Sequence, residues 1–147
     1  MPKDFTDAHR RLGRSAAETH APAEAAHVRS VQAQIDAIAR GDYAAALSAA
    51  HPDIELEIFA PPGFPWIRKA RGIKEIERAL EQNFGSLDDQ QPQISSVLAQ
   101  GDVVVLIGRE TGRIRATNAR YEVEFVHRFT FRDGALASVR IVAATVV

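Results

Sequence analysis

Apolar residues recur with the period of a helix in the first half of the chain and with the period of a strand in the second half. Between about residues 22 and 40 they lie three or four positions apart, which predicts an amphipathic helix that ends at Gly41. Asp42 is placed to cap a short second helix. A third helix is predicted over about residues 73–84, because its apolar positions share one face. These positions are Ile73, Ile76, Leu80 and Phe84.

Alternation of apolar and polar residues predicts strands in the rest of the chain. A first strand covers about residues 54–59, and the proline-rich segment 60–72 after it is expected to fold over apolar surface. Helices segregated from antiparallel hairpins indicate an α+β fold, in which a long curved sheet encloses an apolar interior. The remaining strands are predicted after Pro92, joined by short turns, over about residues 93–99, 103–111, 120–131 and 135–146.

Length and composition limit the class of protein. The 147 residues suit one domain. Residues 1–21 have few large apolar side chains, so we expect a weakly ordered arm there and a single domain over 22–147. Lys plus Arg number 18 and Asp plus Glu 19, a balance that argues against a nucleic-acid binder. The chain has no cysteine, which excludes disulfides and thiolate chemistry.

The sequence carries no signal for a membrane, a metal or a cofactor. No apolar run reaches the roughly 20 residues of a membrane span, and the N-terminus has no apolar signal-peptide core. We therefore expect a cytoplasmic protein with no membrane partner. Histidines and carboxylates nowhere have metal-ligand spacing, and no glycine-rich loop precedes a helix. Neither a metal nor a nucleotide cofactor is expected.

Six short motifs carry a family likeness through their order and spacing. Over about residues 27–147 the chain resembles the nuclear transport factor 2-like superfamily, and within it the SnoaL-like polyketide cyclases and the ketosteroid-isomerase-like proteins. The resemblance implies a cystatin-like cone, with a curved antiparallel sheet wrapped around an apolar cavity and three helices from the N-terminal half. It also implies a homodimer formed through the exposed sheet face. The motifs are Ala39-Arg40-Gly41-Asp42, His51-Pro52-Asp53, Ala70-Arg71-Gly72-Ile73, Gln100-Gly101-Asp102-Val103-Val104, His127-Arg128-Phe129-Thr130-Phe131-Arg132-Asp133-Gly134 and Val139-Arg140-Ile141.

The same resemblance implies that the carboxylates of catalytic members are missing. SnoaL-like and epoxide-hydrolase-like members place a cavity-facing aspartate near the end of the last strand, and this chain has Ala144 there. Epoxide-hydrolase-like members also have an arginine and an aspartate two residues apart on a middle strand, and the nearest match here is Arg109 with Thr111. Ala60 stands where the steroid-isomerase base is expected. Alanine cannot transfer a proton, so the resemblance leaves enzymatic activity open.

His127 and Arg109 are the candidate catalytic residues. His127 is the only histidine well inside the predicted sheet and could act as a general base near neutral pH. The alternative is a core histidine satisfied by a neighbouring polar group. Arg109 must meet an anion if it points inward, and Glu110 has the opposite parity, so only one of the two faces the cavity. The candidate ligand-binding residues are aromatic: Tyr43, Phe64, Trp66, Tyr121, Phe125 and Phe129.

Two functional hypotheses follow. The first is a small enzyme of the isomerase, cyclase or hydratase type that acts on a compact hydrophobic substrate. His127 would be its base, and Arg109 or Tyr121 would stabilise developing negative charge. The second is a non-catalytic protein that binds a hydrophobic ligand or serves as an accessory dimerisation domain. The apolar C-terminal strand favours this second reading, because it builds a wall without acid–base groups.

Overall fold

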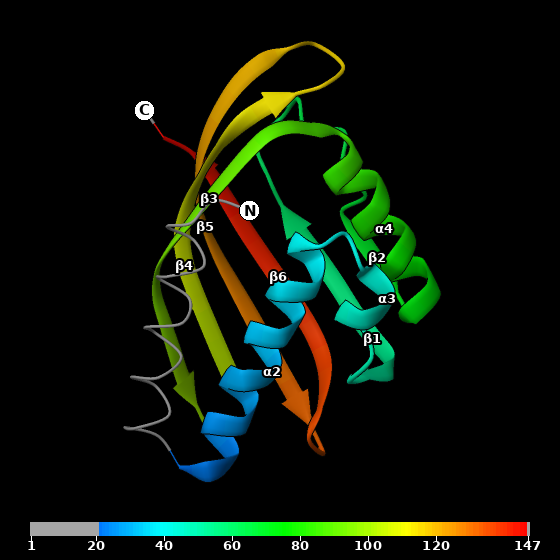
Figure 1. Cartoon of the computed structure of the whole chain (residues 1–147), viewed down its shortest axis with the longest axis vertical. Helices are drawn as coiled ribbons and strands as arrows, with labels where there is room; N and C mark the ends of the chain where they lie inside the picture. Colours follow the sequence, from blue (N-terminus) through cyan, green and yellow to red (C-terminus); the bar gives the residue numbers. More distant parts are fainter. Residues whose placement is uncertain (1–20, 147) are drawn as a thin grey trace.

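The computed structural model describes residues 21–146 as an α+β fold, as predicted (Figure 1). The arm expected over residues 1–21 lies, except for Ala21, outside the described residues. Helices α2, α3 and α4 lie across one face of a curved sheet that does not close on itself. The elements in chain order are α2 (Pro22–Ala39), α3 (Tyr43–Ala46), β1 (Ala50–Phe59), β2 (Lys69–Arg71), α4 (Ile73–Gly85), β3 (Leu87–Gln100), β4 (Val103–Ile114), β5 (Ala119–Arg132) and β6 (Ala135–Thr145).

The six strands form one mixed sheet in the order β2-β1-β6-β5-β4-β3. The expected antiparallel sheet is wrong at one place, since β1 and β6 pair in parallel, with Leu56 opposite Val139. A long connection joins these two strands, so no hairpin turn forces them to run in opposite directions. The three-residue strand β2 was not predicted, because it is too short to show a period.

The sequence signals at the helix ends have the expected structural roles. The carboxylate of Asp42 caps α3 by accepting a hydrogen bond from the Ala45 amide at 3.0 Å. Gly41 has a φ of 74°, a conformation that side chains rarely allow. The core lies between the helices and the inner face of the sheet, where Val28, Ile54 and Val104 are fully buried. No helix within residues 21–146 is long and apolar enough to span a membrane.

Strand β3 begins earlier than predicted and contains an extra residue near its start. Pro92 lies inside the strand, which is possible because β3 is at the edge of the sheet. The register against β4 shifts between Asp88 and Gln91, and Asp89 has a φ of 51°, which together mark a β-bulge. The bulge changes which side chains of β3 face inward, and it turns Gln90 toward the interior.

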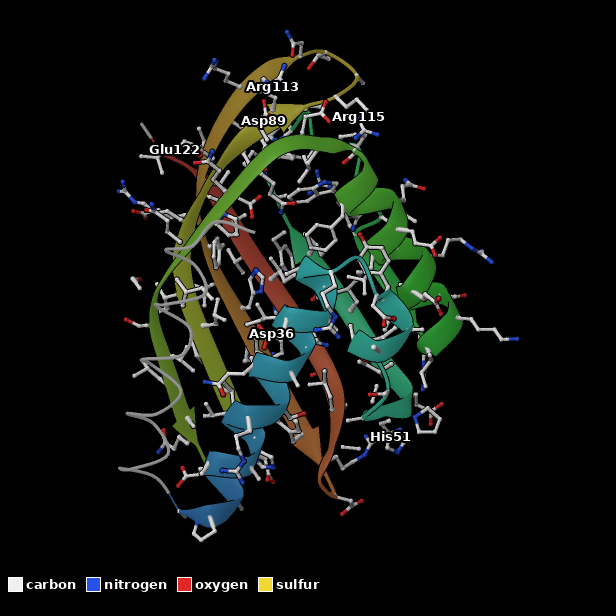
Figure 2. All side chains as sticks on the ribbon, in the orientation of Figure 1. Asp36, His51, Asp89, Arg113, Arg115 and Glu122 are labelled. Atoms are coloured by element: carbon white, nitrogen blue, oxygen red, sulfur yellow. The ribbon has the colours of Figure 1, made fainter. Side chains whose placement is uncertain are left out.

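Two ion pairs connect this bulge to residues at the end of β4. Arg113 pairs with Asp89 at 2.6 Å and Arg115 with Asp88 at 2.9 Å. Figure 2 shows Asp89, Arg113 and Arg115 together at one end of the sheet. The Arg115 guanidinium beside Asp88 holds the pKa of that carboxyl below its usual range. These exposed pairs add little stability individually, but they mark where the bulge is held in register.

Candidate functional site

A cavity of about 540 Å³ lies between the helices and the inner face of the sheet. It is within the size range of small-molecule sites. Arg40 and Gly41, between α2 and α3, line it where the chain is exposed. The interior walls are mainly apolar and include Ile35, Leu47, Ile54, Leu106, Phe125 and Ile141.

Glu110 on β4 carries a carboxyl group into this apolar interior. Its Oε2 accepts a hydrogen bond from the Tyr121 hydroxyl at 2.7 Å, and its Oε1 accepts one from the Gln90 side-chain amide at 3.0 Å. Burial raises the pKa of Glu110 above that of an exposed glutamate, and the two hydrogen bonds only partly oppose this shift. The cavity therefore contains a carboxyl group suited to taking up and releasing a proton.

The Tyr121 ring lies over β4 in the space left by the missing side chain of Gly112. Gly112 lies directly opposite Tyr121 in the β4–β5 ladder, and a Cβ at Gly112 would lie 2.6 Å from the tyrosine oxygen. Phe64 packs edge-on against the Tyr121 ring, with centroids 5.1 Å apart. Burial and the nearby Glu110 raise the pKa of Tyr121, so its hydroxyl stays protonated and donates to Glu110.

His127 faces the cavity from β5, as predicted, between the rings of Phe125 and Phe129 at centroid distances of 4.8 and 6.1 Å. Within residues 21–146 its imidazole makes no hydrogen bond. The structure thus gives it no polar partner of the kind that a core histidine needs. Burial lowers the pKa of His127 to about 4, so the ring is neutral at pH 7.

Glu110 and His127 contact different parts of the same cavity. His127 pairs across the ladder with Leu106, four residues from Glu110, which corresponds to about 13 Å of strand. Their side chains are thus too far apart along the sheet for a short direct hydrogen bond. A molecule of two or three rings could contact both.

Arg109, one of the two candidate catalytic residues, does not point into the cavity. Its guanidinium lies on the outer face of the sheet, where Nε and Nη2 donate to one oxygen of Glu124 at 3.1 and 2.8 Å. Arg109 and Glu124 are direct cross-strand partners, so the solvent-facing pair fixes this orientation. The parity argument was sound, because Glu110 is the residue that faces inward. No sequence signal favoured Glu110 over Arg109.

Ala144 also lies outside the cavity. It is exposed, whereas its neighbour Ala143 lines the interior. The inward position near the end of β6 is therefore an alanine as well, and the carboxyl group of this site comes from β4 instead.

The aromatic candidates fall into two groups. Tyr43 lines the cavity and stacks on Phe84 with centroids 5.9 Å apart; burial, with a smaller effect of Glu81, raises its pKa. Trp66 lines the interior beside Glu110, and Phe125 and Phe129 form part of the wall. Phe64 and Tyr121 do not line it; the buried Phe64 ring packs against Trp66 and Tyr121 instead.

In the part of the chain that the structure describes, no three histidines or acidic residues are grouped so that they could hold a metal ion.

Comparison with known proteins identifies the family. Residues 31–139 match the SnoaL-like domain, which covers most of the chain, so this protein belongs to the SnoaL-like domain family. The match confirms the resemblance to SnoaL-like proteins found in the sequence. No curated protein matches the chain.

Solved structures of similar fold cover most of the chain. A nuclear transport factor 2-like protein from Burkholderia xenovorans is 27% identical, with a TM-score of 0.68 over 82% of this chain and 90% of that one. A proposed SnoaL-like polyketide cyclase from Jannaschia sp. is 19% identical, with a TM-score of 0.73 over 84% and 89%. An epoxide hydrolase of the LEH-like type from M. tuberculosis is 20% identical, with a TM-score of 0.64 over 84% and 86%. The last two likenesses show the fold alone.

Proposed function

We propose that this protein binds a small, mostly hydrophobic molecule in the cavity and moves a proton on it, in an isomerase-, cyclase- or hydratase-type reaction. The observation that carries the proposal is the carboxyl group of Glu110, buried in an apolar cavity between Tyr121 and Gln90. A buried acid destabilises a fold, and acids with a raised pKa in cavities are typical of catalytic sites.

The residues divide the work between proton transfer and ligand binding. Glu110 takes a proton from a carbon next to a carbonyl group and returns it to another atom of the same molecule, so an isomerisation or an internal ring closure needs no co-reactant, whereas a hydratase also takes up water from solvent. Tyr121 and Gln90 hold the carboxyl group in place. His127, neutral at pH 7, binds an oxygen of the ligand. Its low pKa makes it a weak base, which is why Glu110 takes the role first expected of His127.

Deuterium exchange tests this assignment without knowledge of the natural substrate. The probe is 2-tetralone, a bicyclic ketone with acidic C–H bonds, incubated with the protein in D₂O. We expect the protein to accelerate deuterium incorporation, measured by mass spectrometry, and Glu110→Gln to slow it about 100-fold. The matched control is Glu124→Gln on the outer face, which should exchange at the wild-type rate. Equal rates for Glu110→Gln and the wild type would exclude Glu110 as the acid–base group.

The alternative is a ligand-binding protein without catalysis. Two observations favour it: both oxygens of Glu110 already accept hydrogen bonds, and the pKa of His127 is low. Such a protein would bind 2-tetralone without accelerating exchange. Native mass spectrometry of the purified protein would then identify the ligand it carries from the cell.

We also propose that two copies pair through the outer face of the sheet. Phe59, Val142 and Val126 are consecutive partners across β1, β6 and β5, and all three are exposed. Such a row on a sheet face is typical of an interface. Sedimentation velocity should give twice the 16.1 kDa chain mass, and Val126→Glu should give the single-chain mass at the same concentration. A wild-type monomer would contradict the pairing.

A further inference from the structure

The cavity continues into a smaller chamber. This inner chamber has a volume of about 110 Å³ and is lined on its own side by Ile58, Trp66, Leu87, Val123 and Ala143, which are all apolar. The one polar side chain there that does not also line the main cavity is Asn83, and its amide is already occupied by the main chain of Ile67. Oδ1 accepts from the Ile67 N–H at 2.8 Å, and Nδ2 donates to the Ile67 carbonyl at 3.1 Å.

The polar groups of the site lie where the two chambers meet. Gln90, Glu110 and His127 line both the main cavity and the inner chamber. A molecule that occupies both chambers therefore meets these polar groups along its length, whereas the residues that line the inner chamber alone are apolar apart from Asn83.

One wall of the inner chamber, Trp66, is held in place by contacts with Ser86 and Phe64. Trp66 Nε1 donates to the Ser86 hydroxyl at 3.1 Å, and that hydroxyl donates to the Asn83 carbonyl at 2.6 Å. Phe64 packs against Trp66 with centroids 4.5 Å apart. A wall residue with a fixed ring orientation favours ligand groups whose shape fits against it.

We propose that the inner chamber is a subsite for an aryl ring or a compact alkyl group of the ligand. An apolar cavity of about 150 Å³ in another protein stays dry and binds benzene, and the inner chamber is of similar size and opens into the main cavity. The proposal rests on the function given above and adds the position of the apolar end of the substrate, beyond the acid–base group. A charged inner end is disfavoured, since none of the residues that line the inner chamber alone offers a free polar partner.

Toluene is the probe for this subsite, and Trp66 is the reporter, because it is the only tryptophan of the chain. We expect a saturable change in Trp66 fluorescence when toluene binds. Ala143→Ile fills the chamber and should weaken toluene binding at least 10-fold. The matched control is Ala144→Ile, which makes the same change one residue away on the outer face and should bind toluene as the wild type does.

A second variant keeps the test decisive if Ala143→Ile does not fold. Val123→Ala enlarges the chamber and should shift its preference from toluene toward naphthalene. Three results would each overturn the subsite proposal. They are unchanged toluene binding by folded Ala143→Ile, an unchanged ligand preference in Val123→Ala, and no saturable fluorescence change in the wild type.

The toluene test is independent of the proposed reaction, because toluene has no carbonyl group and is not turned over. Loss of 2-tetralone exchange with intact toluene binding would therefore reject the proposed reaction and leave the subsite in place.

Discussion

Gly108→Ala should lower the free energy of unfolding by about 3 kcal/mol, although it adds only a methyl group. Gly108 lies on the inner face of β4, directly opposite Phe125. A Cβ there would lie 2.3 Å from the main-chain oxygen of Gln93 and 2.7 Å from Cζ of Phe125. The oxygen belongs to the backbone of the neighbouring strand and cannot rotate away, so the ladder or the ring must shift. Urea unfolding of the variant and the wild type measures the difference.

Gly85→Ala is the control for this prediction. Gly85 is the last residue of α4, is exposed, and has nothing within 4 Å of an added Cβ. Alanine should raise the free energy of unfolding there by about 0.5 kcal/mol, because glycine loses more backbone entropy on folding. A loss below about 1 kcal/mol for Gly108→Ala would mean that neither the main chain of Gln93 nor the Phe125 ring packs as closely against Gly108 as the structure shows.

Periodicity predicted the elements whose faces are chemically distinct. The third helix was expected over about residues 73–84 and is Ile73–Gly85. The alternation over 120–131 placed His127 and Phe125 on the inner face, where they lie. In both cases one face is apolar over several turns or pairs, so a local pattern reports the long-range packing.

Features that depend on distant parts of the chain could not be read in this way. The parallel pairing of β1 with β6 brings together segments about 80 residues apart, and neither segment encodes the direction of the other. Arg109 and Glu110 are both polar at a strand position, and only the cross-strand partner Glu124 decides which faces outward. Gln90 reaches Glu110 because the bulge at Asp89 changes which side chains of β3 point toward the cavity. No local sequence pattern predicts that bulge.

Acidification from pH 7 to pH 5 should destabilise the protein by about 2 kcal/mol through His127 alone. An unfolded histidine has a pKa of about 6.5, whereas burial lowers the pKa of His127 to about 4. Between these values the unfolded chain binds more protons than the folded one, so stability rises with pH across this window and is lost as pH falls. Asp88 acts only at lower pH, because its folded pKa lies below the usual range of a carboxyl group.

The variant that tests this prediction is His127→Gln, which keeps a polar side chain but cannot be protonated. The free energy of unfolding of this variant should change by less than about 1 kcal/mol between pH 7 and pH 5.

Glu110→Gln is the matched control in the same cavity, because the titration of Glu110 affects stability with the opposite sign to that of His127. The raised pKa of Glu110 means that the folded chain holds that proton more tightly, which favours folding at low pH and is lost as pH rises. In Glu110→Gln, the loss of unfolding free energy between pH 7 and pH 5 should therefore be as large as in the wild type or larger. If His127→Gln lost as much stability as the wild type, the imidazole would be solvated in the folded protein, and its proposed hydrogen bond to a ligand oxygen would have to compete with water.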